Sequence, residues 1–328
     1  MQDASPSPAD PKPETGATPV VSVLVISYNT REMTLECLRS VRDQTTIPHE
    51  VIVVDNNSQD GSAEAMAAEF PEMVLDARSD NLGFAGGNNE AARRAHGKYL
   101  LLLNPDTVVL DNAIDKLVAF AEANPEAGIW GGRTLFGDMS LNPSSCWQRM
   151  TVWNCFCRMS GLTAIFPNSA FFNAEGYGGW PRDTEREVDI VQGCYLLITK
   201  EMWDTLGGFD PAFFMYGEEA DLCLRARNTL GARPRVTPNS TIIHYGGASE
   251  TVRSDRMVKL MTGKIALIDR HFPKWQRPVG RFFYGMFPLT RLIATRTLGT
   301  LTGKASLKES ADVWADVWAR RKVWRAGY

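Results

Sequence analysis

The stretch Tyr99–Asp106, YLLLLNPD, decides the fold class of this 328-residue chain. Tyr99 and four consecutive leucines are typical of a strand that is buried on both faces, as in a parallel sheet. Pro105 has no N–H to donate to a central ladder, so the strand must end before it. Asp106 is therefore expected at the carboxyl edge of the sheet, where open α/β folds bind ligands. A carboxylate there suits a divalent cation that holds a diphosphate.

Strand and helix patterns alternate along the sequence before this stretch. In chain order, the expected strands are Val20–Ser27, Glu50–Asp55 and Met73–Ala77, and the expected helices are Thr30–Gln44, Ser62–Glu69 and Asn88–Ala95. Such alternation with short links predicts an α/β fold with a doubly wound, mostly parallel sheet and helices on both faces.

The pattern changes after the next expected helix, Ile114–Asn124. Residues 131–180 have weak periodicity and predict loops and short strands over the active face. Four further elements are expected after them: a strand-like run at Val188–Thr199, helices at Lys200–Leu206 and Glu218–Leu230, and an extended segment at Val236–His244.

Composition and cysteine usage indicate a soluble protein of the cytoplasm. Residues 1–19 are rich in Pro, Ser and Ala, predict a disordered tail and lack the apolar core of a signal peptide. No run reaches the roughly 18 to 20 apolar residues of a membrane span. The six cysteines form no CxxC pair, which disfavours a zinc site and predicts buried, reduced thiols.

The formal charge of −3 hides a basic C-terminal region. Residues 253–328 carry 16 Lys and Arg against 5 Asp and Glu, or +11, whereas the rest carries 19 against 33, or −14. Residues 274–292 mix Lys and Arg with Trp275, Phe282 and Phe283, and residues 311–328 have Trp314 and Trp318 at helical spacing, followed by further Arg and Lys. Such basic, aromatic segments can lie on an anionic membrane surface. Packing on the catalytic domain and contact with a second copy in a homodimer are the alternatives. Nucleic acid is not expected as a partner, because no recognition module is present.

Polar residues close the first two expected strands. Ser27, Tyr28 and Asn29 end the first strand, and Asp55 ends the second. A carboxylate or amide at this place can accept the N3–H of a uracil or thymine base, while Tyr28 packs on the base. Each residue alone is equally typical of a turn or helix cap. The occurrence of Asp55 and Asp106 at one predicted sheet edge favours nucleotide binding.

A glycine-rich stretch, NLGFAGGNN, runs from Asn81 to Asn89. Its glycines, Gly83 among them, would let the backbone approach a ligand closely, and the following helix N-terminus favours phosphate. Asn81, Gly83 and Asn88 are therefore candidate donor-binding residues. The spacing fits neither GxGxxG nor the P-loop, which disfavours a dinucleotide dehydrogenase and a kinase-like ATPase.

Three carboxylates, Glu218, Glu219 and Asp221, begin an expected helix after the aromatic run 213–216. Acids are favoured at helix N-termini, so a solvated first turn is one interpretation. The aromatic run instead suggests a cleft with apolar walls, where a carboxylate has a raised pKa and can serve as a base. His244 ends a later β-like run, where a lone His is more often structural than a ligand. An imidazole beside Asp106 would complete a site for Mn²⁺ or Mg²⁺ better than one for zinc.

Six motifs in this order resemble inverting glycosyltransferases of family two with the GT-A fold, and especially their rhamnosyltransferase-like members in polysaccharide assembly. The motifs are VSVLVISYNT, EVIVVDNNSQDGS, DNLGFAGGNNEA, GKYLLLLNPDTVVL, GGFDPAFFMYGEEADLCLR and IIHYGG. The resemblance covers roughly residues 20–247. It implies a catalytic domain at 20–250, with a nucleotide-sugar half at 20–125 and an acceptor half at 126–250, and a basic helical extension at 251–328.

The resemblance also assigns roles to individual residues. Asp106 matches the last acid of a metal-binding DxD-like motif, whose first position is Asn104 here, so Mg²⁺ or Mn²⁺ is the implied cofactor. Glu219 stands where these enzymes usually carry a catalytic Asp, which leaves Glu219 or Glu218 as the base. The remaining assignments are the nucleoside site at Ser27, Tyr28, Asn29 and Asp55, acceptor contacts at Gly193, Cys194 and Asp221, and a metal-side contact at His244.

The implied reaction moves a sugar, for example rhamnose, from dTDP or UDP to a glycan or polyprenyl-diphosphate-linked acceptor. A lipid-linked acceptor would place the protein peripherally on the inner face of the cell membrane. Two alternatives stay open. A nucleotidyltransferase should show a Gly-rich, Arg- or Lys-bearing loop after its first strand, where residues 27–30 read SYNT. A catalytically weakened protein that only binds sugar nucleotide, or supports a partner, is compatible with Asn104 and Glu219.

Overall fold

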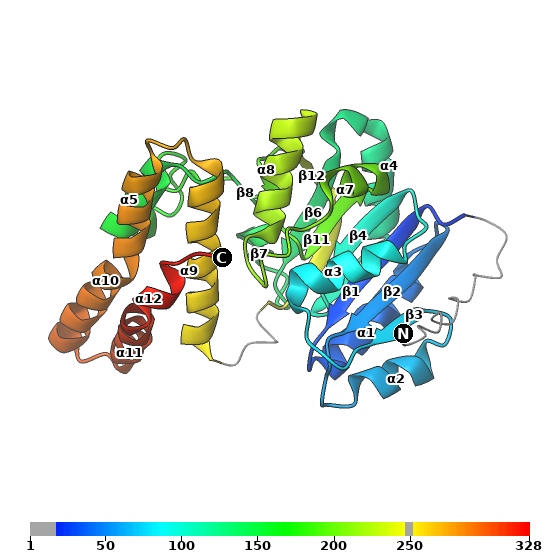
Figure 1. Cartoon of the computed structure of the whole chain (residues 1–328), viewed down its shortest axis with the longest axis horizontal. Coiled ribbons are helices and arrows are strands. Elements are labelled where there is room, and N and C mark those ends of the chain that lie inside the picture. Colours follow the sequence, from blue (N-terminus) through cyan, green and yellow to red (C-terminus); the bar gives the residue numbers. More distant parts are fainter. Residues whose placement is uncertain (1–17, 247–251) are drawn as a thin grey trace, which may run out of the picture.

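The computed structural model describes residues 18–246 and 252–328, and it has two parts (Figure 1). One is a sheet with helices on both faces, and the other is a body of helices beside it. Residues 1–17 of the predicted tail lie outside the described residues. This arrangement confirms the predicted α/β fold with a helical C-terminal extension.

The first half of the sheet is parallel, as the sequence predicts. Its strands are β1 (Val21–Ser27), β2 (His49–Asp55), β3 (Val74–Ala77) and β4 (Tyr99–Leu103), and they lie in the order β3-β2-β1-β4. Helices α1 (Arg31–Gln44), α2 (Ser62–Glu69) and α3 (Gly83–Arg93) connect them.

All five residues of β4 are buried, and they alternate between two cores. Leu100 and Leu102 face the core that α3 covers, whereas Tyr99, Leu101 and Leu103 face the core of α1 and α4 (Ala113–Ala123). Because helices cover both faces, every position in β4 is apolar instead of every second one. This is the physical reason for the continuous run YLLLL.

The second half of the sheet is mixed. β11 (Tyr195–Thr199) runs antiparallel to both β4 and β6 (Ile129–Leu135), and β12 (Arg235–His244) runs parallel to β6. β5 (Thr107–Val109) closes the order β3-β2-β1-β4-β11-β6-β12-β5 by pairing antiparallel with β12. Four of these seven neighbouring pairs are parallel. The mostly parallel sheet is therefore confirmed, with β11 as an antiparallel insertion.

Residues 131–180 contain more regular structure than their weak periodicity predicts. β6 is a central strand, and its glycines are sites of close packing: an added Cβ would lie 2.5 Å from Val191 Cγ1 at Gly131 and 2.7 Å from the Tyr195 ring at Gly132. Glycine at these positions hides the strand from propensity arguments. A capping box between Thr151 and Asn154 begins α5 (Val152–Ser160).

The other elements are short or agree closely with the sequence prediction. They are α6 (Leu162–Ile165), α7 (Lys200–Leu206), α8 (Glu218–Leu230), β7 (Leu141–Asn142), β8 (Cys146–Trp147), β9 (Arg186–Glu187), β10 (Ile190–Val191) and two single 3₁₀ turns, η1 (Pro125–Ala127) and η2 (Pro143–Ser145). α7 and α8 have the predicted bounds. Among the described residues, no helix is long and apolar enough to cross a membrane.

The helical body combines the C-terminal helices with α5. Its C-terminal members are α9 (Arg253–His271), α10 (Arg277–Thr302), α11 (Ala305–Ala319) and α12 (Arg321–Trp324). Val317 and Trp324 are fully buried in its core, and Trp314 and Trp318 pack against that core. The apolar side of α11 covers α9 and α10, so Trp314 and Trp318 are half-buried, and the expectation that they lie on a membrane stays a prediction.

Helix α9 joins the two parts, because it packs closely on the residues before α8. An added Cβ at Gly263 of α9 would overlap the carbonyl oxygen of Tyr216 and lie 3.7 Å from the backbone nitrogen of Gly217. Only glycine permits this approach of the two backbones. The start of α8 is thus held against the helical body.

We predict that Gly263→Ala lowers the free energy of unfolding by about 1–3 kcal/mol, because the added methyl group must push α9 away from Tyr216. The matched control is Gly299→Ala in α10, where the nearest atom to an added Cβ is 3.4 Å away. The control should be neutral or gain up to about 1 kcal/mol from helix propensity. Urea unfolding measures both, and equal destabilisation of the two variants would contradict the prediction.

Candidate active site

The carboxyl ends of β1, β2 and β4 bring candidate residues to one edge of the sheet. Ser27 and Asp55 are partners in the register of β1 and β2. β4 lies on the other side of β1 and ends at Leu103, directly before Asn104. The structure therefore gathers the predicted strand-end residues at the edge where α/β folds bind ligands.

Asp55 and Asn29 fix the shape of the loop after β2. The Asp55 carboxylate accepts hydrogen bonds from the Ser58 hydroxyl at 2.6 Å and the Ser58 N–H at 2.9 Å. Asn29, in a left-handed conformation (φ 52°), accepts from the Gln59 N–H at 2.7 Å. Tyr28 beside them is 40% exposed, so its ring is available to a ligand.

Ser27 does not have the side-chain role that the sequence suggests. Its hydroxyl is fully buried and faces Thr34 Oγ1 at 3.3 Å, because alternation along β1 turns it towards α1. Only its carbonyl oxygen reaches the loop, where it accepts from the Asn56 N–H at 2.9 Å.

Asp106 and His244 meet because β5 pairs with β12. The register places His244 opposite Thr107, the residue after Asp106, and the Tyr245 N–H donates to the Asp106 carbonyl at 3.0 Å. His244 Nε2 lies 3.4 Å from Asp106 Oδ1 and 3.4 Å from Asn104 Nδ2. Asp106 is 6% exposed, so the pair is largely shielded from solvent.

Asp106 and His244 shift each other's pKa values. Burial raises the pKa of Asp106, but the contact with His244 lowers it more, and the pKa ends below its ordinary value. Burial lowers the pKa of His244, whereas Cys194 and Asp106 raise it more, and the pKa ends above its ordinary value. Asp106 is therefore ionised at neutral pH, and a metal ion that binds His244 would displace a proton.

The residues present fit a hard divalent cation whose coordination would be completed by a bound diphosphate. Asn104 Oδ1 and His244 Nδ1 are buried and have no hydrogen-bond partner in the described part of the chain. Within residues 18–246 and 252–328, no three His, Cys, Asp or Glu side chains are grouped to hold a metal. Asp106 and Asn104 offer oxygen atoms of the kind that Mg²⁺ and Mn²⁺ prefer. Diphosphate oxygens would have to supply further ligands.

The glycine-rich stretch serves packing instead of the close ligand approach that the sequence suggests. α3 begins at Gly83 (φ 72°), where an added Cβ would lie 2.5 Å from the Phe214 carbonyl oxygen. The Gly83 N–H donates to Asn81 Oδ1 at 2.8 Å, and the Phe84 N–H donates to the Phe214 carbonyl at 3.0 Å. Asn88 is 1% exposed and donates to Phe84 O within the helix. The first donors of α3 are thus already paired, which argues against the predicted phosphate contact.

Glu219 lies against the loop between β10 and β11. Gln192 Nε2 donates to Glu219 Oε1 at 3.0 Å, and the Gly217 N–H donates to Oε2 at 3.3 Å. Gly193 leaves room here, since an added Cβ would lie 3.6 Å from Glu219 Cβ and 3.2 Å from Phe84 Cε1. The loop is thus within van der Waals distance of Glu219, and the absence of a side chain at Gly193 relieves crowding against the Phe84 ring.

The same loop connects Glu219 to Asp106. Cys194 follows Gly193, and its carbonyl oxygen accepts from the Asn104 N–H at 3.1 Å. Its buried thiol lies beside the His244 imidazole. Gly193 and Cys194, both predicted to lie near the acceptor, thus link Glu219 to Asn104 at the end of β4.

Sequence reasoning missed Gln192 and Trp147. Trp147 Nε1 donates to Gln192 Oε1 at 2.7 Å, which orients the Gln192 amide so that its nitrogen faces Glu219. The available signal was a polar residue that interrupts the apolar run VDIVQGC before Gly193. Trp147 gave no signal, because its short strand β8 lies in the segment of weak periodicity.

The acid pair is buried at the first turn of α8. Glu218 is 4% exposed and Glu219 is 9% exposed, and Glu218 Oε2 has no hydrogen-bond partner among the described residues. Burial raises the pKa of both carboxyls, and the neighbouring Glu219 charge raises that of Glu218 further. Two adjacent buried carboxylates cannot both ionise easily, so the pair tends to hold a proton.

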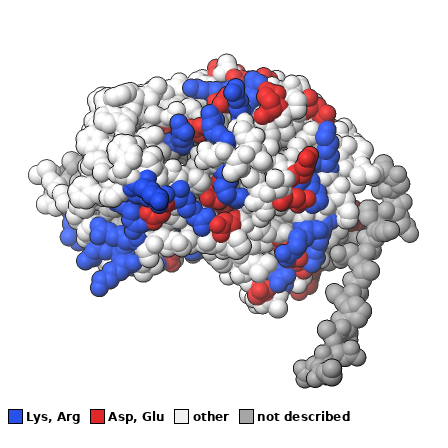
Figure 2. All heavy atoms as spheres, turned by 45° about the horizontal axis from the view of Figure 1, so that its top comes forward, with Lys and Arg blue, Asp and Glu red and all other residues white. Residues whose placement is uncertain are grey.

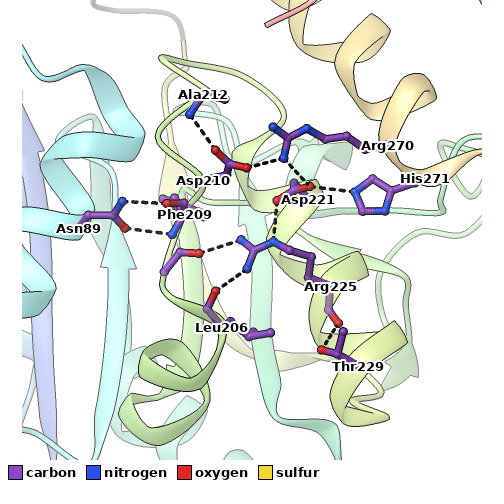
Figure 3. Close-up of polar contacts among 11 residues, drawn as sticks. Asn89, Leu206, Phe209, Asp210, Ala212, Asp221, Arg225, Thr229, Arg270 and His271 are labelled. Atoms are coloured by element: carbon purple, nitrogen blue, oxygen red, sulfur yellow. Dashed lines mark hydrogen bonds and ion pairs between the residues drawn. The ribbon is translucent and has the colours of Figure 1, made fainter.

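Asp221 connects α8 to α9 and is not placed to contact an acceptor (Figure 3). Its Oδ1 lies 2.9 Å from His271 Nε2, and its Oδ2 accepts from Arg225 Nε at 2.7 Å. Arg270 lies 3.6 Å from the same carboxylate and pairs with Asp210 at 2.5 Å. With 1% of its surface exposed, Asp221 has both oxygens committed to these partners. The predicted acceptor role is thus corrected to a structural one.

Comparison with known proteins shows which family the sequence resembles. Residues 22–184 match the family model "Glycosyl transferase family 2". O-antigen biosynthesis protein RfbC of Myxococcus xanthus is 30% identical over 238 residues, or 71% of this chain, but the match spans only 18% of that protein's length. N-acetylglucosaminyl-diphospho-decaprenol L-rhamnosyltransferase of Mycobacterium tuberculosis is 24% identical over 306 residues, or 85% of this chain and 94% of that protein.

A solved structure has the same fold. It is the mannosyltransferase PcManGT of Pyrobaculum calidifontis in complex with GDP-Man and Mn²⁺. It aligns over 98% of this chain and 90% of its own, with a TM-score of 0.56 and 17% identity. At this identity the likeness concerns the fold alone, and it agrees with the predicted GT-A architecture.

We predict that Glu218→Gln removes part of the pH dependence of stability. The folded-state pKa of Glu218 lies above its ordinary value, so the folded protein binds this proton more tightly than the unfolded chain does. That stabilising contribution is present in acid and is lost as pH rises from about 4.5 through the raised pKa. The variant should therefore be more stable than the parent at pH 8, with a smaller difference at pH 4.

Urea midpoints between pH 4 and pH 8 measure this effect. The control is Glu72→Gln, because Glu72 is exposed and its side chain stays in water in both states. A Glu218→Gln protein that loses stability at pH 8 would contradict the assigned direction.

Proposed function

We propose that this chain, which belongs to glycosyl transferase family 2 and is a glycosyltransferase, is a metal-dependent, inverting enzyme. It moves a sugar from a nucleoside diphosphate to a hydroxyl of a glycan or lipid-linked acceptor. One observation carries the proposal: the Asp106–His244 pair and the buried Glu219 are joined through the loop of residues 192–194. A candidate metal-binding group and a candidate base are thereby connected within one structural unit.

The donor lies at the carboxyl ends of β1, β2 and β4 in this proposal. Tyr28 packs on the base, and Asp55 or the loop that it organises accepts the base N3–H. Asp106, with Asn104 and His244, holds Mg²⁺ or Mn²⁺ together with the diphosphate. The bound ion supplies charge stabilisation to the departing diphosphate.

Glu219 is the general base of the proposed reaction. Its carboxylate takes the proton of the acceptor hydroxyl, whose oxygen attacks C1 of the sugar from the face opposite the diphosphate. The new C1–O bond forms as the bond from C1 to the diphosphate oxygen breaks, so one displacement inverts the anomeric centre. Gln192 supports this role because its amide holds one Glu219 oxygen while burial raises the pKa of the carboxyl.

The names of the relatives guide the choice of substrates. One relative is named as a rhamnosyltransferase that uses N-acetylglucosaminyl-diphospho-decaprenol, and another as an O-antigen biosynthesis protein. We therefore propose a rhamnose donor on dTDP or UDP and an acceptor on a polyprenyl diphosphate. The reaction class is cell-envelope polysaccharide synthesis.

We predict that Glu219→Gln lowers the rate of sugar transfer by about 10²- to 10⁴-fold, because the amide cannot accept the acceptor proton. Glu218→Gln is the matched control: it removes a neighbouring buried carboxyl of the same helix turn and should retain more activity. Single-turnover transfer and circular dichroism measure rate and fold. Turnover near that of the parent in the Glu219→Gln protein would refute the base assignment.

We predict that the true donor raises the melting temperature in the presence of Mn²⁺, in proportion to the logarithm of its concentration at saturation. A panel of dTDP-, UDP- and GDP-sugars with and without Mn²⁺ identifies it. Asp106→Asn should remove the Mn²⁺-dependent part of the shift, because the amide has no charge for the ion. A full Mn²⁺-dependent shift in this variant would exclude Asp106 as a ligand.

A further inference from the structure

The helical body exposes more apolar surface than its packing requires. Among the described residues, 11 of the 19 exposed large hydrophobic side chains lie on α5, α6, the segment that follows α6, or α9–α12 and their connections. They are Trp153, Ile165, Phe166, Phe171, Trp275, Val279, Phe282, Ile293, Leu298, Leu301 and Val323. Exposed apolar side chains that lie side by side mark an interaction site.

Aromatic rings connect three of these side chains, Phe171, Trp153 and Phe282, into one row, here called the aromatic ridge. The ridge consists of Phe171, Trp153, Phe156, Phe283 and Phe282. Its successive ring centroids are 4.9, 5.5, 5.4 and 5.7 Å apart. Both ends are open to solvent, because Phe171 is 63% exposed and Phe282 is 59% exposed. The ridge therefore crosses from the segment after α6 to α10.

Helix α10 extends the apolar surface along its length. Val279, Phe282 and Ile293 lie at spacings that place them on one side of a helix, and all three are exposed. Trp275, just before the helix, is 77% exposed. A helix in contact only with water would carry polar residues on this side.

Unpaired cations surround this apolar surface. Lys274, Arg277, Arg296, Lys304 and Lys308, at the two ends of α10 and the start of α11, have no carboxylate partner in the part of the chain that the structure describes. Figure 2 shows Lys and Arg gathered at the lower left, beside a broad surface with few charges at the upper left. Residues 253–328 together carry the charge of +11.

We propose that the aromatic ridge and these cations form a docking surface for an anionic membrane. Aromatic side chains insert at the boundary between headgroups and acyl chains, and nearby Lys and Arg attract anionic headgroups. A second copy is a poor occupant, because two such surfaces would bring the same cations, Lys304 and Lys308 among them, against each other. The contact is peripheral, since no described helix is suited to span a membrane.

This surface includes part of what the sequence suggested, because Trp275, Phe282 and Phe283 lie in the basic, aromatic run of residues 274–292. Trp314 and Trp318 pack inward on the core of the helical body, whereas the ridge lies on α5, α10 and the segment after α6. Membrane docking is also independent of the proposed reaction, although it would bring the enzyme to a lipid-linked acceptor. A protein without transferase activity could still bind vesicles through the ridge.

Vesicle flotation of the full chain tests the proposal. The chain should float with vesicles of phosphatidylglycerol and phosphatidylcholine at low salt, and at least tenfold less with phosphatidylcholine alone or at high salt. Phe171→Ser with Phe282→Ser should lower the apparent affinity for anionic vesicles at least tenfold. Lys304→Gln with Lys308→Gln should lower it several-fold, with no effect on neutral vesicles.

The matched control is Phe136→Ser with Leu230→Ser, which removes two exposed apolar side chains of similar exposure, 41% and 43%, from the sheet domain. It should float like the parent. The single variants Phe171→Ser and Phe282→Ser preserve the test if the double variant is unstable by circular dichroism. Equal flotation of ridge variants and control, absence of flotation of the parent, or a parent dimer in light scattering that the ridge variants lose would each overturn the proposal.

Discussion

Burial of β4 on both faces is the constraint on which the candidate active site depends. Two cores hold Tyr99–Leu103 from above and below, and β1 and β11 hold its two edges. The strand cannot shift or rotate without breaking both cores and two ladders of hydrogen bonds. Asn104 and Asp106, which follow it directly, therefore emerge at a fixed point of the sheet edge.

The rest of the site is assembled around that point by long-range pairing. β5 turns away from β4 and meets β12, which delivers His244 to Asp106. The loop before β11 carries Gly193 between Phe84 and Glu219. The end of β4 on one side and the loop at Gly193 on the other thus set the distance between Asp106, the proposed metal ligand, and Glu219, the proposed base.

The helical body supports the site through contacts between α9 and α8. Asp221 stands one turn from the start of α8, and its contacts with His271 and Arg270 of α9 fix that helix in place. Gly263 lets the same helix α9 touch the backbone before Glu218. The buried acid pair is thus supported by a salt-bridge network and by close backbone packing, which offsets the cost of holding two carboxyls away from water.

The sequence was most informative where burial alone determines the residue types. β4, α7 and α8 have the bounds that their patterns predict, because apolar runs and helical faces report burial directly. β6 was not predicted, because glycine is required at Gly131 and Gly132 by close packing against residues that are distant in sequence. For the same reason Gly83 suggested a ligand, although its neighbour is Phe214. Trp314 and Trp318 show that an amphipathic pattern reveals a buried side without revealing what covers it.

The topology also has a consequence for synthesis of the chain. β11 is the second sheet partner of β4, after β1, yet about 90 residues separate Leu103 from Tyr195. At roughly 5–20 residues per second, the ribosome needs about 5–20 s to supply that partner. During this interval the four leucines of β4 present an open hydrogen-bonding edge, which is a template for association with other chains. Wrong pairing of the β4 edge is therefore a hazard until β11 has been synthesised.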